Sequence, residues 1–316
     1  MEQLENLSKL LYTFTKVRGA KVISRFLDNE PKYLHTILSL LSRPVASNLL
    51  ENEVRDDQAS KEPLTDTAST AALSWETRYL LLLWTAHLML TPFDLTTVSE
   101  LASKEALTKA GLPLHLPLVV FDLLEICGVY IQSSSNEQSV AATTLVKLVL
   151  RPDMRRLSLH DVVIQRSLAT LADDTQDLHL LNGQLMFLSG IVSSANADHI
   201  LDHLLPIYTL ISSIFHEETS GYVHIRSSAV SKKLAIKIQR NITVHILQHE
   251  QSPESVAHKV SITMLQEQGV LEDVIDYLLK ALADRDTQVR LAASKALSVV
   301  ATKLDCLLYT SPSPRD

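Results

Sequence analysis

The sequence predicts an all-α protein, a HEAT/armadillo-like α-solenoid of stacked helical hairpins. Apolar residues recur at helical spacing along most of the chain, and glycine is scarce, with 7 residues among 316. Residues 284–297 (DRDTQVRLAASKAL) follow an apolar helix pattern, as the turn and second helix of a HEAT-type hairpin would. Because tight turns and phosphate-binding loops depend on glycine, its scarcity argues against nucleotide-binding α/β folds and most all-β folds.

Helical patterns fill the chain with short breaks, and no alternating stretch is long enough to predict a strand. We expect N-terminal helices in residues 1–50, a flexible loop in 51–73, a HEAT-like helical repeat array in 74–305 and a non-native or disordered tail in 306–316. The expected helices cover residues 3–16, 32–50, 74–90, 96–109, 116–131, 137–150, 155–172, 177–193, 197–216, 222–248, 253–267, 270–283 and 287–303.

Two segments interrupt this pattern. Residues 51–72 mix charges, Ser/Thr and Pro63 with few large apolar side chains, which predicts a loop; a partner-binding insertion is the alternative. The last ten residues lose helical periodicity and contain Pro312 and Pro314. We expect a non-native tail, which would place the end of the natural sequence near Cys306, with a natural disordered terminus as the alternative.

The last predicted pair of helices has the clearest pattern. Its first helix has an apolar stripe at i, i+3, i+4, i+7, i+8 and i+11, formed by Leu271, Val274, Ile275, Leu278, Leu279 and Leu282. The second helix repeats this spacing with Val289, Ala292, Ala293, Ala296, Leu297 and Val300. We expect Asp286 to cap the second helix and to form, with Arg290, a ladder of polar contacts between adjacent repeats. Weaker versions of this hairpin pattern occur at residues 75–90 and 221–240, and the intervals between them are irregular.

Composition excludes several classes of function. A formal net charge of −7 gives no basic footprint for nucleic acid. The two cysteines, Cys127 and Cys306, cannot form a disulfide framework, which suits a reducing compartment. The N-terminus lacks the pattern of a signal peptide, and the longest apolar run, residues 79–90, is shorter than the ~20 residues that span a bilayer. We therefore expect a cytoplasmic protein without membrane insertion.

No pattern in the chain predicts catalysis, and we expect no catalytic residue, cofactor or metal. His199 and His203 stand at i and i+4 beside Asp198 and Asp202, but a metal site needs three or four supported ligands. We interpret them as exposed helix residues. An enzyme that uses this face is the least favoured alternative.

Three further features were weighed as sites. Cys127, in an apolar helix end, is expected to be a buried small hydrophobe, and residues 216–218 (His-Glu-Glu) are expected to be solvated. One helix has a basic side, which we interpret as a solvated face, with binding of an acidic partner as the alternative. The candidate partner-binding residues are Lys232, Lys233, Lys237 and Arg240.

Four blocks together resemble the tubulin-folding cofactor D proteins (tubulin-specific chaperone D). They are KVRGAKVISRFLDNEP (16–31), SWETRYLLLLWTAHLMLTPFDL (74–95), LRPDM (150–154) and DRDTQVRLAASKAL (284–297). The second block is the most specific, and the order of the four is similar to the N-terminal region of that family. Trp75, Tyr79, Leu82, Leu83 and Trp84 in this block are expected to be core residues.

The resemblance implies a non-enzymatic HEAT-repeat chaperone in the making of αβ-tubulin. Such a protein captures β-tubulin, joins it to α-tubulin with other tubulin-folding cofactors, and associates with an Arf-like small GTPase. It would be cytoplasmic and could associate with microtubules. The family protein is far longer, so this chain resembles an N-terminal fragment of it. The alternative within scaffolds is a HEAT-repeat adaptor of nuclear transport or a phosphatase scaffold.

Overall fold

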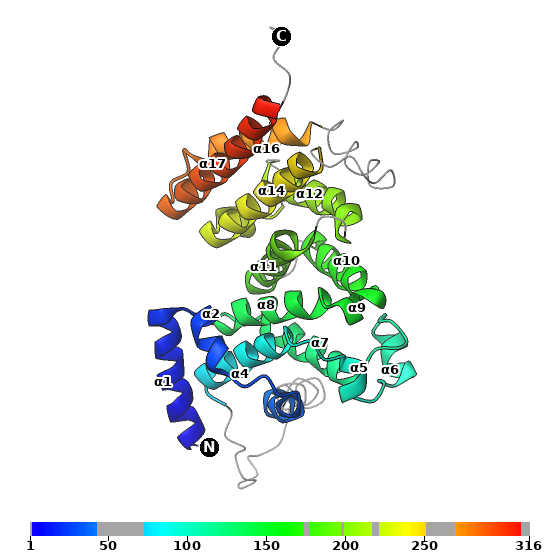
Figure 1. Ribbon diagram of the computed structural model, residues 1–316. Coiled ribbons are helices and arrows are strands. Elements are labelled where there is room, and N and C mark those ends of the chain that lie inside the picture. Colours follow the sequence, from blue (N-terminus) through cyan, green and yellow to red (C-terminus); the bar gives the residue numbers. More distant parts are fainter. Residues whose placement is uncertain are drawn as a thin grey trace, which may run out of the picture. The chain divides into compact units, whose positions relative to one another are not determined.

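The computed structural model describes residues 2–42, 73–173, 177–196, 199–216, 221–250 and 269–310 (Figure 1). Helices fill these ranges, and the described residues contain no strand, only an isolated bridge between Leu101 and Pro117. The all-α, armadillo-type class predicted from the sequence is confirmed. The predicted loop at 51–72 and the predicted helix at 253–267 lie outside the described residues.

The chain divides into two compact units, Met1–Val162 and Val163–Asp316. The domain boundaries expected at residues 50, 73 and 305 stay predictions. No helix in the described ranges has the length and apolar character needed to cross a bilayer.

Unit 1 centres on a helix that is apolar on nearly every side. The helix α4 buries four consecutive leucines, at positions 80–83, which are at most 8% exposed. It packs on α1 through one side and on α8 through another, and α8 also contacts α7. The helices of unit 1 are α1 (Glu2–Arg18), α2 (Ala20–Ile23), η1 (Ser24–Phe26), a helix at 32–42, α4 (Trp75–Leu88), α5 (Leu95–Val98), α6 (Lys104–Lys109), α7 (Leu118–Tyr130), α8 (Glu137–Val149) and α9 (Pro152–Arg156).

Helix ends in unit 1 follow local chemistry. Ser74 caps α4 by accepting a hydrogen bond from the Thr77 N–H at 3.4 Å. The helix ends at Leu88, before Pro92, whose ring cannot continue a helix. Between α1 and α2 the backbone turns at Gly19 with φ of +88°, a conformation that favours glycine.

In unit 2 the long helix α14 is the common neighbour of the others. It packs on α11, α12, α16 and α17, and its buried Ser231 hydroxyl lies 2.6 Å from the Asn182 amide oxygen of α11. The helix α10 (Leu159–Ala172) contains the boundary between the units. The remaining helices are α11 (Leu178–Ser194), α12 (Leu201–Phe215), α13 (Val223–Ser227), α14 (Ala229–Glu250), α16 (Val270–Ala281) and α17 (Thr287–Thr310).

Several predicted boundaries were wrong. The expected helix 96–109 is two short helices, α5 and α6, and 155–172 is broken where Ser158 takes a φ of 54°. The expected helix 222–248 breaks at Ser228, and α2 and η1 were not predicted. Finally, α17 continues to Thr310, beyond the helix end predicted at residue 303. Residues 311–316 lie outside the described residues.

Candidate functional site

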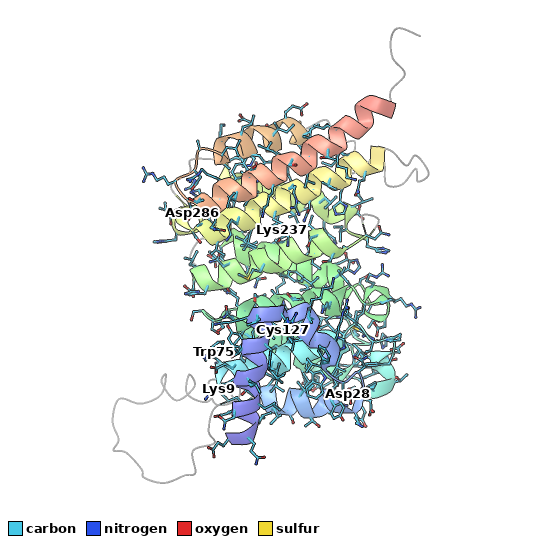
Figure 2. All side chains as sticks on the ribbon, turned by 60° about the vertical axis from the view of Figure 1, so that its left-hand side comes forward. Lys9, Asp28, Trp75, Cys127, Lys237 and Asp286 are labelled. Atoms are coloured by element: carbon cyan, nitrogen blue, oxygen red, sulfur yellow. The ribbon has the colours of Figure 1, made fainter. Side chains whose placement is uncertain are left out.

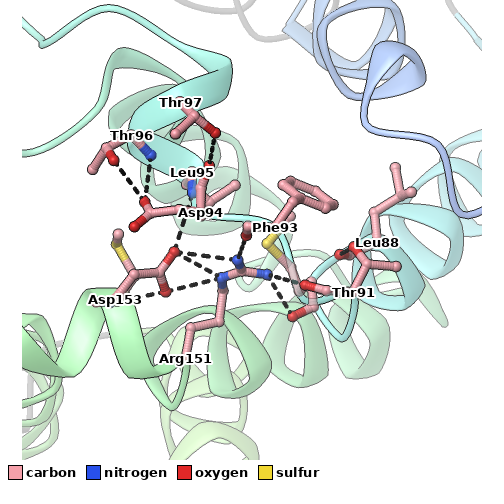
Figure 3. Close-up of polar contacts among 11 residues, drawn as sticks. Leu88, Thr91, Phe93, Asp94, Leu95, Thr96, Thr97, Arg151 and Asp153 are labelled. Carbon is pink, nitrogen blue, oxygen red and sulfur yellow. Dashed lines mark hydrogen bonds and ion pairs between the residues drawn. The ribbon is translucent and has the colours of Figure 1, made fainter.

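Arg151 organises the turn that follows α4 (Figure 3). Its guanidinium donates to the carbonyls of Met89 at 2.8 Å and Thr91 at 3.2 Å, and also to the carbonyl of Phe93. The same group lies over the Phe93 ring, 5.3 Å from its centroid, and only 7% of the side chain is exposed. Because carbonyls in an irregular turn have no helical partner, a buried guanidinium with several donors satisfies them together.

A pair of aspartates completes this junction. Asp153 accepts from Arg151 Nε at 3.1 Å and from the Leu95 N–H at 3.2 Å, so it joins the start of α9 to the start of α5. Asp94 caps α5 by accepting from the Thr96 N–H at 2.8 Å. Hydrogen bonds from the Thr96 side chain and backbone lower the pKa of Asp94. The blocks 74–95 and 150–154 are therefore two halves of one contact.

The block at 16–31 packs on the same helix. The Trp84 indole N–H donates to the Asp28 carbonyl at 2.7 Å, and the Trp84 ring lies 5.2 Å from that of Tyr33. On α1, the Tyr12 ring meets Trp75 edge-on with centroids 4.7 Å apart; Figure 2 labels Trp75 and Asp28. The expectation of a core role is confirmed for Tyr79, Leu82 and Leu83, which are buried, whereas both tryptophans are part-exposed at the α1–α4 and 27–33 contacts.

A buried ion pair ties α4 to α8. Arg78 Nη2 lies 2.7 Å from Glu137 Oε1, and Glu137 is 1% exposed. Arg78 also donates to the Leu73 carbonyl at 2.7 Å. Beside this pair, burial raises the pKa of Tyr130 to about 12, and its hydroxyl donates to the Leu41 carbonyl at 3.2 Å. Arg78, Glu137 and Tyr130 each have a partner here, as a buried polar group requires.

These contacts link three of the four blocks in one unit, and a known family covers the same region. A family model described as tubulin-specific chaperone D-like, ARM repeat, matches residues 1–170. The chain belongs to the tubulin-specific chaperone D-like family. Membership supports a role of the tubulin-chaperone type, with tubulin-related partners, rather than the alternative adaptor roles in nuclear transport or phosphatase assembly. No solved structure matches the chain.

The fourth block of this tubulin-specific chaperone D-like chain forms the α16–α17 turn. Asp286 caps α17, as predicted, by accepting from the Gln288 N–H at 2.7 Å and the Val289 N–H at 3.1 Å. The predicted ladder between repeats was wrong, because Arg290 instead donates to the carbonyls of Asp284 and Arg285 in its own turn, each at 2.9 Å.

The contact between neighbouring hairpins is made by Asp284 and Lys232. Their side chains lie 2.6 Å apart and join the α16–α17 turn to α14. Burial alone would raise the pKa of Asp284, but hydrogen bonds from Lys232 and from the Asp286 N–H lower it overall.

The basic residues considered as a partner surface have different surroundings. Lys232 forms an ion pair with Asp284, and Arg240 donates to the side chain of the neighbouring Asn241 at 2.7 Å. By helical spacing Lys233 and Lys237 lie on a different side of α14 from Lys232. Lys237, labelled in Figure 2, is exposed. Loss of hydration, together with the charge of Arg240, lowers the pKa of Lys237. A partner role for Lys232, Lys233, Lys237 and Arg240 stays a prediction.

The residues considered as possible metal ligands are not arranged as the sequence suggested. His199 precedes α12, which begins at Leu201, so His199 and His203 do not share one helix. Asp198 lies outside the described residues, within which no group of three metal-ligating side chains gathers. Asp202 and His203 lie in the first turn of α12.

Two other sequence interpretations had opposite outcomes. Cys127 is fully buried, as predicted, and burial raises the pKa of its thiol to about 12. His216 is not solvated as expected, since its ring stacks on Tyr277 with centroids 4.5 Å apart and contacts Gln239 at 2.9 Å. Burial lowers the pKa of His216. Glu217 and Glu218 lie outside the described residues.

Sequence reasoning missed a surface on α1, α2 and η1, which we call the α1 surface. It combines exposed apolar side chains with exposed cations. The apolar members are Leu7, Leu10, Phe14, Val17, Val22 and Phe26. The cations are Lys9, Lys16, Arg18, Lys21 and Arg25. The signal was present in the sequence, because residues 6–27 contain no Asp or Glu.

Proposed function

We propose that this chain assists αβ-tubulin assembly by binding β-tubulin non-covalently, together with other tubulin-folding cofactors and an Arf-like small GTPase. It would act in the cytoplasm, where it could associate with microtubules, and would perform no catalysis. The proposal is carried by the match of residues 1–170 to the tubulin-specific chaperone D-like family. The quoted family blocks also form contacts with one another, since Arg151 and Asp153 of one block hold the turn of another.

The junctions described above suit such a role because they fix helix surfaces without covering them. The turn after α4 is held by five donor–acceptor contacts of Arg151 and Asp153, which leave the outward sides of the helices available. A chaperone that binds only the folded partner stabilises that partner by mass action. Rigid helix pairs also lower the conformational entropy lost on binding.

The experiment uses the purified full chain with isolated β-tubulin and, separately, α-tubulin. Size-exclusion chromatography with light scattering measures complex formation, and the GTPase is added in its GDP and GTP states. We expect a complex with β-tubulin and a weaker one, or none, with α-tubulin. Absence of a β-tubulin complex at about 10 μM of each protein, with the chain shown to be helical and monodisperse, contradicts the proposal.

A further inference from the structure

The α1 surface contains an apolar seam along one side of a helix. Leu7, Leu10, Phe14 and Val17 are 52%, 54%, 48% and 75% exposed. They are spaced by three, four and three residues, the spacing of the a and d positions through which one helix packs on another. A seam of this kind is narrower than the apolar face with which a helix usually covers a core.

The opposite side of α1 is already occupied, so the seam is not a core face turned outward. Ser8, Tyr12 and Thr15 are buried on that side. Tyr12 contacts Trp75 and Tyr79 of α4 with ring centroids 4.7 and 5.0 Å away, and its hydroxyl accepts from Asn136 Nδ2 at 2.6 Å. In Figure 1, α1 runs along the edge of its unit, with α4 on one side.

From Leu7 to the end of η1, the charged side chains are all cations. Arg18 stands beside the seam on α1, Lys9 and Lys16 lie further round the same helix, and Lys21 and Arg25 follow beyond its C-terminal end; all five are exposed. No carboxylate lies between Glu5 and Asp28, although the whole chain has a formal net charge of −7. Lys16 also lies over the Tyr12 ring at 4.9 Å, which keeps its ammonium beside the helix. The local positive charge therefore attracts an acidic partner, although the net charge of the whole chain is negative.

We propose that the α1 surface is a docking site for an acidic amphipathic helix of a partner protein. Leucine-like side chains at the same spacing would pack between Leu7, Leu10, Phe14 and Val17, and flanking Glu or Asp side chains would pair with the cations. The seam favours a helix over a bilayer, since membrane-surface helices bury a broad apolar face and the seam is one a/d row wide. Phe26, which is 81% exposed, and Val22 extend the apolar contact past Gly19.

A synthetic peptide that contains no tubulin sequence tests this surface. If the peptide does not bind, the proposed β-tubulin binding is unaffected, and if β-tubulin does not bind, the peptide test is unaffected. The probe is a labelled helix with Leu at the 3-4-3 spacing and Glu at the flanking positions. A peptide of the same composition in scrambled order is its control. Fluorescence anisotropy with the full chain measures affinity, and we expect saturable binding that weakens as NaCl rises from about 0.05 to 0.5 M.

Two matched variants locate the binding. The double substitution Leu10→Ser and Phe14→Ser changes exposed residues, so the fold should persist by circular dichroism while affinity falls by about tenfold or more. Leu279→Ser is the control, because Leu279 is also 53% exposed but lies beside the acidic Asp276, and this variant should bind as the parent does.

Several outcomes overturn the proposal. They are equal binding of the scrambled peptide, equal loss of affinity in Leu279→Ser, binding only after residues 51–72 are deleted, and self-association of the chain through this surface in light scattering. Tighter binding to vesicles of anionic lipid than to the peptide also overturns it, in favour of a membrane surface.

Discussion

In unit 1 the turn after α4 is held by Arg151, a residue 62 positions away from the first carbonyl that it binds. In unit 2 the turn before α17 is held mainly from within, by Asp286 and Arg290, and one ion pair from Lys232 links it to α14. The two turns have the same task, which is to satisfy the carbonyls and N–H groups between helices. They differ in whether the partner is distant or local.

Burial separates the two arrangements energetically. Arg151 is 7% exposed, whereas Lys232 and Asp284 are 29% and 16% exposed. Removing one partner of a buried network leaves charges and carbonyls without hydrogen bonds, and this costs more than the loss of a hydrated pair. The turn in unit 1 thus depends on one distant, buried side chain. The turn in unit 2 is held by several side chains, each of which contributes part of the hydrogen bonding.

The largest effect is expected for Arg151→Ala. It removes the donor of the Met89, Thr91 and Phe93 carbonyls and leaves Asp153 without its cation, so the free energy of unfolding should fall by about 3–5 kcal/mol. Urea denaturation of the full chain followed by circular dichroism measures the loss. Arg156→Ala, at an exposed position one turn on, should change it by less than about 0.5 kcal/mol. Equal effects of the two substitutions would contradict the comparison.

A smaller loss, about 1–2 kcal/mol, is expected for Asp284→Asn, since its ion pair with Lys232 is only part-buried. Hydrogen exchange should show faster opening at the α16–α17 turn and in the facing part of α14. Asp276→Asn is the control, because its pair with Lys280 is exposed on both sides and should contribute almost nothing. A loss as large as that of Arg151→Ala would show that both turns depend on a single distant partner.

Asp286→Ala should cost about 1 kcal/mol, the usual effect of removing an N-terminal cap. Its two acceptor contacts, to Gln288 and Val289, are local, so the damage should stay within the first turn of α17. Asp286→Ser keeps an acceptor and should restore most of the lost stability. Amide exchange at residues 287–290 distinguishes a local loss from a global one.

The smallest effect is a pH dependence in unit 2. Because burial lowers the pKa of His216, the folded state favours the neutral ring, and this contribution is complete above the ordinary histidine pKa of about 6.5. It is lost as the pH falls below that value, since the unfolded chain takes up the proton first. His216→Phe keeps the stacking on Tyr277 and should lose less stability than the parent between about pH 7.5 and 5.5. Equal losses in urea denaturation would exclude a role for this ring.

The sequence predicted features that depend on near neighbours. The existence of the long helices, the cap at Asp286 and the burial of Cys127 follow from spacing and residue type within a few positions. Short elements were missed because four residues, as in α2, contain too little periodicity to detect. The break at Ser158 needs a left-handed backbone at a residue other than glycine, which no local pattern indicates.

Distant pairings could not be predicted in this way. Nothing near Arg151 indicates that it binds the turn at residues 89–93, and Lys232 was grouped with other cations although it pairs with Asp284. The α1 surface was missed for a different reason. Its a/d spacing resembles that of a core face, and only the burial of Tyr12 on the opposite side shows which face points outward.

The placement of the two tryptophans has a spectroscopic consequence. Trp75 and Trp84 are the two tryptophans of the sequence, and both lie on α4 in unit 1. Intrinsic indole emission therefore reports unit 1 alone, whereas helical ellipticity reports both units. Trp75 senses α1 through Tyr12, and Trp84 senses the 27–33 segment through its hydrogen bond to Asp28. If each tryptophan is replaced in turn by phenylalanine, the emission of the other reports separately on the release of α1 or of the 27–33 segment during thermal unfolding of unit 1.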